Sequence, residues 1–364
     1  MSLAAPLTRA ALEAGGFSLK RRSFDDLAGF NGDDHLAAFQ VFQKSCAAIA
    51  AKAAPLRKGA PASAAFEAVA HAALREQVTD AAQAQRFFET HFRPFDISVK
   101  GRVHGGNGFL TGYYEPLVEG SLARSRDFAA PVLARPDNHE SLNPYPSRAE
   151  IEAGAIGSHS HPVVWLRDFV EVFLIHVQGS ARIRLTDGRV MRLVYAGRNG
   201  LPYTSIGRRL IDSGEIMEAD MSLAALKQWI RAHGQNPGEA GLTLMHRNQS
   251  YVFFDLKDEL EPAAGPIGGQ GIGLTALRSI AIDRTIWPYG LPFWIDTELP
   301  WQSAAASPFR RLLIAQDTGS AIVGPARVDI FFGSGDDAGA RAGDIRHADD
   351  VTVLLPAVEG WSDE

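Results

Sequence analysis

Three aspartates lie at the ends of short apolar runs in the last third of the chain. Asp283 follows RSIAI, Asp317 follows LLIAQ, and Asp329 lies at the start of VDIFFG. Aspartate is depleted within strands and is costly to bury unless it is paired or hydrogen-bonded. Turn capping is the ordinary explanation for one such residue. Three at strand ends instead indicate a carboxylate cluster, and clustered carboxylates suffice for glycosidic cleavage without a cofactor.

Composition limits the classes of protein that have to be considered. The 364 residues suffice for about two domains, and 46% hydrophobic with 21% charged residues is typical of a soluble globular protein. A net charge of −6, with scattered Lys and Arg, gives no reason to expect a nucleic-acid partner. Cys46 is the only cysteine, which excludes an intrachain disulfide and a cysteine-based zinc site.

The start of the chain bears on localisation. MSLAAPLTRAALEAGG lacks the basic and apolar regions of a secretory signal. A chain that begins after a removed signal has the same appearance, so cytoplasmic and exported locations both stay open. No apolar run approaches the roughly 20 residues of a membrane span.

The expected elements are helices first and then mostly strands. Residues 1–33 read as an irregular lead-in, and helices are expected over 34–54, from Pro61, and after Thr79. Residues 170–197 read as three strands, with a hairpin at Asp187-Gly188. Two helices within 205–234 and further strands up to 356 complete an α+β pattern, mainly β, in which one domain is inserted into another.

Three other kinds of site are less well supported. GGQGIG at 268–273 has dinucleotide-loop spacing, but prolines precede it and a strand follows it. His159 and His161 lack the carboxylate partners of a catalytic zinc site, so no metal is expected. No G-x-S-x-G elbow is present for a serine nucleophile. Tyr113 and Tyr114 can stack on sugar rings or simply fill a half-buried strand, and the residues leave both open.

Several motifs together resemble the membrane-bound lytic murein transglycosylase A (MltA) family, whose carboxy-terminal part is the three-aspartate or 3D domain. The resemblance runs from Phe109 to Pro356. The motifs that carry it are LTGYYEP (110–116), PSRAEIEAGAI (146–156), VQGSARI (177–183), YAGRNGLPYTSIGRRLIDSGEI (195–216), NQSYVFF (248–254), AIDRTIWPYG (281–290), AQDTGSAIVGPARVDIFFG (315–333) and AGARAGDIRH (338–347).

The resemblance implies a fold and a reaction. The fold is a double-psi β-barrel with a helical N-terminal segment and an inserted β-rich domain, with a groove between them. Its parts are expected at 1–115, 116–245 and 246–364. The reaction cleaves the β-1,4 bond between N-acetylmuramic acid and N-acetylglucosamine of peptidoglycan without a cofactor. The muramyl C6 hydroxyl attacks its own C1 and leaves a 1,6-anhydro end.

The resemblance also assigns roles to the aspartates. Asp329 serves as acid and then as base, Asp317 tunes it or steadies the transition state, and Asp283 is the supporting third aspartate. An intramolecular nucleophile is held by the substrate, so no second carboxylate has to position water. Asp329 must then be protonated near neutral pH, far above the ordinary aspartate pKa of about 3.9, and burial beside Asp317 acts in that direction.

Glycan strands of peptidoglycan are the expected partner, and the chain is expected to be a monomer. Family members are lipid-anchored to the outer membrane in the periplasm, whereas the cysteine here is internal, so an anchor would need residues outside this sequence. The rival hypotheses are a hydrolytic glycosidase that uses Asp317 or Glu115 to activate water, and a silent glycan-binding module. The residues expected to bind the glycan are Tyr113, Tyr114, Glu115, Gln178, Gly179, Ser180, Tyr195, Asn199 and Ser205.

Overall fold

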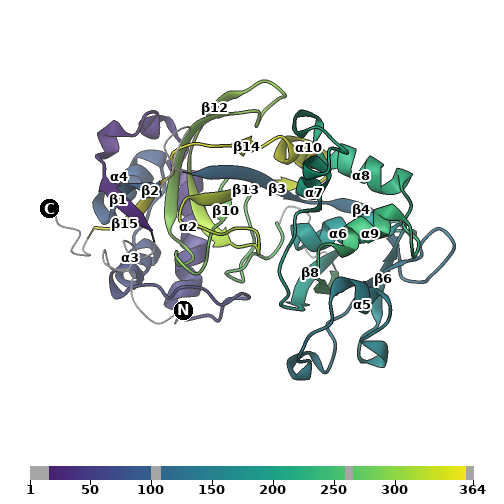
Figure 1. Ribbon diagram of the computed structural model, residues 1–364. Coiled ribbons are helices and arrows are strands. Elements are labelled where there is room, and N and C mark those ends of the chain that lie inside the picture. Colours follow the sequence, from purple (N-terminus) through teal and green to yellow (C-terminus); the bar gives the residue numbers. More distant parts are fainter. Residues whose placement is uncertain (1–15, 100–107, 259–264, 358–364) are drawn as a thin grey trace. The chain divides into compact units, whose positions relative to one another are not determined.

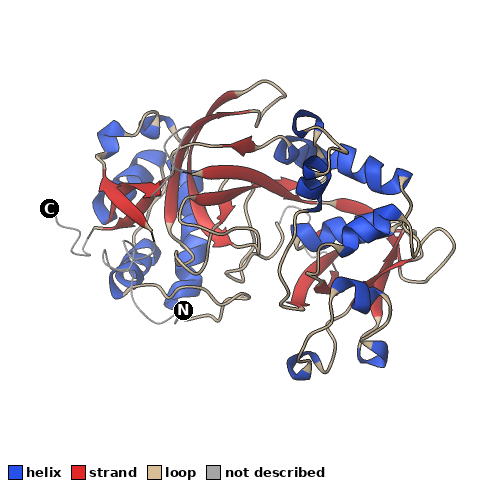
Figure 2. Ribbon diagram, in the orientation of Figure 1, coloured by secondary structure: helices blue, strands red, loops and turns tan. Residues whose placement is uncertain are grey.

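The computed structural model describes residues 16–99, 108–258 and 265–357 (Figures 1 and 2). The chain divides into two compact units. The first comprises Met1–Tyr113, Ile267–Gly333 and Asp337–Glu364, and the second comprises Tyr114–Pro266 with Ser334–Asp336. The chain therefore leaves the first unit near residue 113 and returns to it near residue 267, as expected for a mixed α+β protein with an inserted domain. The amino-terminal stretch that bears on a signal segment lies outside the described residues.

A nine-stranded sheet forms the centre of the first unit. In the middle of the sheet, β10 pairs in parallel with β12 and antiparallel with β13. The order among the described residues is open, with β1 and β14 at its ends, so the expected double-psi barrel stays a prediction. The strands in order are β1 (Phe17–Arg21), β2 (Phe92–Val99), β15 (Thr352–Pro356), β11 (Pro292–Leu299), β12 (Ser307–Asp317), β10 (Ser279–Ala281), β13 (Arg327–Ser334), β3 (Phe109–Glu115) and β14 (Arg346–His347).

The three expected N-terminal helices are present as α2 (His35–Ala50), α3 (Ala64–Arg75) and α4 (Ala81–His91). Each begins at a side chain that accepts a backbone N–H, from Asp34, Ser63 and Asp80 respectively. Because Ser63 provides the cap, α3 begins after Ser63 rather than at Pro61. The helices share a core of phenylalanine rings. The helix α2 packs on β12 (Figure 1).

The lead-in before these helices is more ordered than expected. Residues Phe17–Arg21 form β1, which pairs antiparallel with β2 over five residues, and short 3-10 helices η1 (Phe24–Asp26) and η2 (Phe30–Gly32) follow. The partner strand lies more than seventy residues away in the sequence, so no local pattern reveals the pairing.

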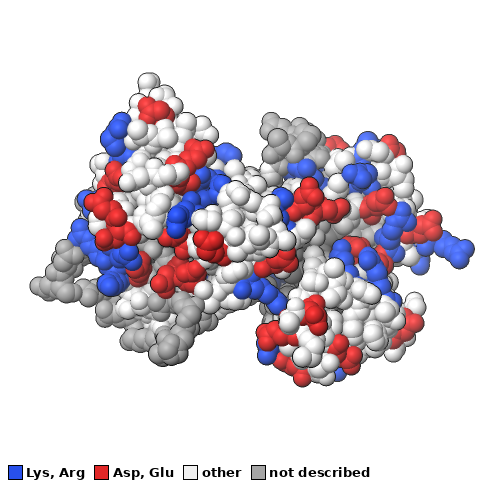
Figure 3. Space-filling view, turned by 90° about the horizontal axis from the view of Figure 1, so that it is seen from above, with Lys and Arg blue, Asp and Glu red and all other residues white. Residues whose placement is uncertain are grey.

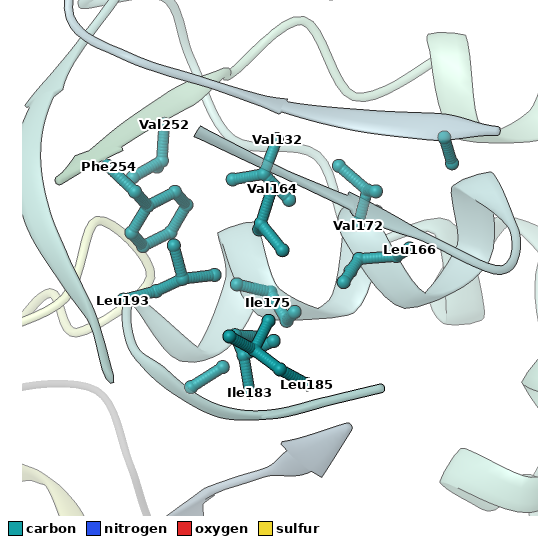
Figure 4. Packing of buried hydrophobic residues seen from close by; sticks show 12 residues of the cluster. Val132, Val164, Leu166, Val172, Ile175, Ile183, Leu185, Leu193, Val252 and Phe254 are labelled. Carbon is teal, nitrogen blue, oxygen red and sulfur yellow. The ribbon is translucent and has the colours of Figure 1, made fainter. Parts of the chain in front are cut away.

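A six-stranded sheet forms the second unit, with helices packed on it. Val164, Ile183, Leu193 and Phe254 meet Ile175 of a helix in its core (Figure 4). The sheet order is β5 (Ala130–Leu133), β6 (Pro162–Leu166), β4 (Leu117–Ser121), β7 (Ala181–Leu185), β8 (Val190–Arg198) and β9 (Val252–Asp258). The helices are η3 (His139–Ser141), α5 (Arg148–Glu152), η4 (Gly157–His159), α6 (Phe169–Gln178), α7 (Ile206–Asp212), η5 (Glu218–Asp220), α8 (Leu223–Ala232) and α9 (Ala240–His246).

The first of the three strands expected within 170–197 is instead the helix α6. Asp168 caps it by accepting from the N–H of Glu171, and Gly179 ends it with φ +84°. Val172 and Ile175 face the sheet core, while Phe173 and its neighbours face a second cluster formed with α7, α8 and α9. A helix that is apolar on every side lacks the helical periodicity by which it would be recognised, so it reads as a buried strand.

The second unit also reaches further along the chain than residue 245. β9 was expected in the barrel with the rest of 246–364, but it pairs antiparallel with β8 from Val252 to Asp258. The second unit accordingly continues to Pro266. Short strands carry no mark of which sheet they join, because pairing is decided by partners distant in the sequence.

Charged residues of both signs are mixed on the surface. On the face shown in Figure 3, acidic and basic residues are interspersed and do not gather into one large patch of a single sign. Across the described residues, every helix is too short or too polar to cross a bilayer.

Candidate active site

The short strand β10 brings Asp317 and Asp329 together. Ala281 pairs with Asp317 on β12 and with Asp329 on β13, so the two aspartates lie on either side of one residue. Two strand spacings separate their Cα atoms by about 10 Å, and residues in register project from the same face of a sheet. The sequence predicted this pair, and the sheet places both carboxylates in the first unit.

The carboxylate of Asp317 is surrounded by hydrogen-bond donors. Its Oδ1 accepts from the backbone N–H groups of Gly269 at 2.7 Å and Thr318 at 2.8 Å. Its Oδ2 accepts from the hydroxyl of Tyr113 at 2.8 Å. Burial raises the pKa of Asp317, while the charge of Arg57 and these three hydrogen bonds act against that rise.

The glycine-rich loop at 268–273 supplies one of these donors. A Cβ on Gly269 would lie 2.6 Å from the hydroxyl oxygen of Tyr289, so only glycine lets the backbone approach Asp317 this closely. The strand β10 follows the loop, as the sequence predicted, whereas a dinucleotide loop opens a helix. The loop is thus part of the aspartate site, a role that the sequence analysis missed.

Asp329 has a much poorer set of donors. Its Oδ1 accepts from the hydroxyl of Thr111 at 2.5 Å, and its Oδ2 has no hydrogen-bond partner among the described residues. The Thr111 oxygen itself accepts from Nη2 of Arg327 at 2.8 Å. Arginine can only donate, so the threonine proton is directed to Oδ1. A proton on Asp329 is therefore directed to Oδ2, the oxygen that is left without a donor.

The two aspartates differ in the number of hydrogen bonds that they accept. Burial raises the pKa of Asp329, Arg327 and the Thr111 hydroxyl act against that rise, and the negative charge of Asp317 raises it further. Asp317 accepts three hydrogen bonds and Asp329 only one. Hydrogen bonds donated to a carboxylate favour its charged form. The donors therefore favour the charged form more strongly at Asp317 than at Asp329.

Asp283 is close in sequence to this site but has a different role. Its Oδ1 accepts from the N–H and hydroxyl of Thr285, and its Oδ2 accepts from the N–H of Gly324 at 2.8 Å. Gly324 has φ +113° and belongs to the connector between β12 and β13. Asp283 therefore holds the connector that joins the strands of the other two aspartates, and its supporting role in the reaction stays a prediction.

Three further side chains of the site escaped the sequence analysis. Arg57 donates to the backbone oxygen of Thr318 at 2.8 Å and comes from the N-terminal segment, in which no motif was recognised. Thr111 and Arg327 lie inside recognised motifs but were not singled out. Alternation could have revealed Thr111, because it lies two residues before Tyr113 and shares its face of β3. Those two residues donate to Asp329 and Asp317 respectively.

Two of the residues expected to bind glycan use their polar atoms for contacts within the second unit. Glu115 is completely buried, with its carboxylate 2.9 Å from Nε of Arg192, 3.2 Å from Nε of Arg182, and accepting from the Ser334 hydroxyl at 2.8 Å. Asn199, 4% exposed, donates to the backbone oxygens of residues 146 and 249 and accepts from the N–H of Tyr251. The polar atoms of both residues thus hold the second unit together, and their contact with a glycan stays a prediction.

Some of the remaining residues expected to bind glycan have a contact that stabilises the fold, and others have none that would prevent glycan binding. Tyr113 is in the aspartate site, and the side-chain oxygen of Gln178 accepts from the N–H of Tyr114 at 3.2 Å. Gly179 ends α6, and Ser205 caps α7 by accepting from the N–H of Arg208. Ser180 is 8% exposed and Tyr195 packs half-buried against the core of the second unit. Their contact with a glycan stays a prediction.

Comparison with known proteins places this architecture in a family. The MltA specific insert domain matches residues 109–255, and the 3D domain matches residues 278–355. Membrane-bound lytic murein transglycosylase A of Escherichia coli K12 is 35% identical over 274 residues, which are 73% of this chain and 72% of that protein.

Solved structures agree with this match. A membrane-bound lytic murein transglycosylase from Agrobacterium tumefaciens is 34% identical, with a TM-score of 0.81 over 94% of this chain and 98% of that chain. E. coli MltA with bound chitohexaose is 27% identical, with a TM-score of 0.66 over 94% of each chain. The chain belongs to the MltA family, with the family's insert domain followed by its 3D domain.

Proposed function

We propose that this protein is a lytic transglycosylase that cleaves the β-1,4 bond between N-acetylmuramic acid and N-acetylglucosamine of peptidoglycan. The observation that carries the proposal is the asymmetry of the aspartate pair. Burial raises the pKa of both carboxyls, but among the described residues Asp329 accepts one hydrogen bond and keeps Oδ2 free, whereas Asp317 accepts three. The relatives are lytic murein transglycosylases, and a crystal structure of the E. coli relative holds chitohexaose.

In the proposed reaction, Asp329 acts first as acid and then as base. The proton on Oδ2 passes to the glycosidic oxygen as the C1–O bond breaks. The C6 hydroxyl of the muramyl residue attacks C1, and the Asp329 carboxylate takes the proton of that hydroxyl. The products are a free 4-hydroxyl and a 1,6-anhydro end, and no water is consumed.

The surrounding residues support the two states of Asp329. The hydrogen bond from Thr111 favours the carboxylate that exists between the two proton transfers. Asp317, fixed by Tyr113, Gly269 and Thr318, supplies a preorganised negative charge near the positive charge that develops at C1. The proposal includes the double-psi barrel, a glycan-binding groove with Tyr113 in it, action as a monomer, and a periplasmic location with outer-membrane attachment.

Hydrolysis is less well supported by the same contacts. A hydrolase needs a second carboxylate that accepts a proton from water. All three donors around Asp317 point at its oxygens, and Glu115 is buried between two arginines. The three donors make Asp317 a poorer base for water, and Glu115 is enclosed by its ion pairs.

Digestion of purified sacculi, with mass spectrometry of the products, tests the proposal. We expect anhydro-muropeptides, which are lighter than hydrolysed products by one water. Asp329→Asn should abolish turnover and keep glycan binding, whereas Asp337→Asn, at an exposed position on α10 (Asp336–Gly343), should act as the wild type does. Hydrolysed products, or near-normal turnover by Asp329→Asn, would refute the mechanism. Failure to digest sacculi at all would leave only a binding module.

A further inference from the structure

The second unit contains a cavity that has no part in the aspartate chemistry. Its volume is about 390 Å³, within the range of small-molecule sites. It lies among β5, β6, α5, η4 and the start of α6. Most of its wall is apolar, with Leu133, Ile151, Ile156, Phe169 and Val172 among the lining residues.

One polar group of the wall has no partner in the protein. Tyr251 is 1% exposed and lines the cavity, yet its hydroxyl forms no hydrogen bond within the described part of the chain. Its ring is fixed by contacts with His176, Phe253 and the guanidinium of Arg148. Burial and the nearby Glu152 raise the pKa of Tyr251, so the hydroxyl keeps its proton and can donate. A buried hydroxyl without a partner is costly, and a ligand acceptor in the cavity removes that cost.

An acceptor lies on the same wall. Glu152 lines the cavity, and its two oxygens are held by Nη1 of Arg148 at 3.2 Å and by Nε2 of His246 at 2.8 Å. A carboxylate oxygen has a second lone pair, so Glu152 can still accept from a ligand N–H. Tyr251 and Glu152 therefore offer one donor and one acceptor to a polar ligand in the cavity.

An aromatic platform completes the cavity. Trp165 of β6 lines it, and the guanidinium of Arg124 lies 5.6 Å from the centre of its ring. An indole held in this way offers an apolar surface to the CH face of a sugar ring. The lining thus combines a surface for a pyranose, a donor and acceptor pair for an amide, and apolar side chains for a methyl group.

We propose that this cavity binds one N-acetylhexosamine residue of a glycan strand, as a site separate from the aspartate pair. The acetamido carbonyl accepts from Tyr251, its N–H donates to Glu152, and the sugar ring lies on Trp165. The proposal rests on the proposed function, because it takes the glycan of peptidoglycan as the source of the sugar.

Fluorine NMR of the full chain labelled with 5-fluorotryptophan tests the site without turnover, in the Asp329→Asn background. The sequence has six tryptophans, and the resonance that Trp165→Phe removes is that of Trp165. Titration with di-N-acetylchitobiose should shift this resonance saturably, and cellobiose, which lacks the acetamido group, should not shift it. Equal shifts with both sugars, or none with either, would overturn the proposal.

Tyr251→Phe provides the sharper comparison, because it keeps the ring contacts and removes only the hydroxyl. It should weaken the titration of the Trp165 resonance about three- to tenfold, the effect of one lost hydrogen bond. Tyr145→Phe is the matched control, since that hydroxyl bonds to His139 and lies outside the cavity lining. An unchanged affinity in Tyr251→Phe would refute the assignment. The sacculus assay on the wild type tests the proposed function separately, so the failure of one proposal is distinguishable from the failure of the other.

Discussion

Replacement of Thr111 by valine isolates the single donor of Asp329. Valine keeps the shape of threonine but cannot donate to Oδ1, so the carboxylate that forms when Asp329 gives up its proton loses its only hydrogen bond. Arg327 keeps other acceptors, because its Nη1 donates to the backbone oxygens of Val328 and Phe109. The substitution thus removes the one donor of Asp329 and one of the acceptors of Arg327.

The magnitude follows from the difference between two hydrogen bonds. A bond to a charged acceptor contributes about 1.5–3 kcal/mol and a bond between neutral groups about 0.5–1.5 kcal/mol. The carboxylate state of Asp329 therefore loses about 1 kcal/mol more than the protonated state does. At about 1.4 kcal/mol per tenfold, kcat should fall roughly five- to tenfold. The same loss makes Asp329 a weaker acid, so the alkaline limb of the pH–rate profile should move to higher pH.

The assay is the initial rate of anhydro-muropeptide release across a range of pH, with thermal unfolding measured in parallel. Thr111→Ser keeps the hydroxyl and should restore both the rate and the alkaline limb. A merely structural role for Thr111 would lower stability or the plateau rate without moving the limb. A kcat within twofold of the wild type together with an unmoved limb would show that Thr111 does not act on Asp329.

Two other substitutions test the charges around the site and the buried ion pair. Asp317→Asn removes the negative charge that raises the pKa of Asp329, so that pKa should fall. The acid form is then lost at lower pH, and the alkaline limb of the pH–rate profile should move to lower pH. An unmoved limb would contradict the like-charge argument. Glu115→Gln leaves Arg182 and Arg192 without their carboxylate and should reduce the free energy of unfolding by about 3 kcal/mol or more in urea titrations. Glu119→Gln, which removes an exposed pair with Arg167, is its control and should cost under about 1 kcal/mol; equal losses in the two variants would mean that the burial of Glu115 is unimportant.

Local sequence signals were reliable where the cause of the structure is local. The starts of α2 and α4 follow from Asp34 and Asp80, whose side chains cap helices within a few residues of themselves. The same reasoning failed for α6, because the cause of its apolar sequence is not local. The sheet on one side and α7, α8 and α9 on the other bury two faces of the helix.

The candidate site shows the same division. Asp317 and Asp329 could be predicted because carboxylates at the ends of apolar runs are unusual in any fold. The role of Glu115 could not, since an acid within a motif looks the same whether it faces a ligand or two arginines. Only the burial of Glu115 between Arg182 and Arg192 separates the two cases.

The sequence by itself determined the residue types that can do the chemistry, the motifs that identify the family, and the absence of a cysteine-based metal site. The tertiary structure decided which of the two aspartates keeps an oxygen without a donor. That choice depends on donors from β3, from the loop at Gly269 and from the segment at Arg57, which lie between 48 and 261 residues from the aspartate or neighbouring residue that each contacts. Hydrogen-bond donors lower the pKa of a carboxyl. These donors meet only in the folded chain, so no local sequence pattern reveals them.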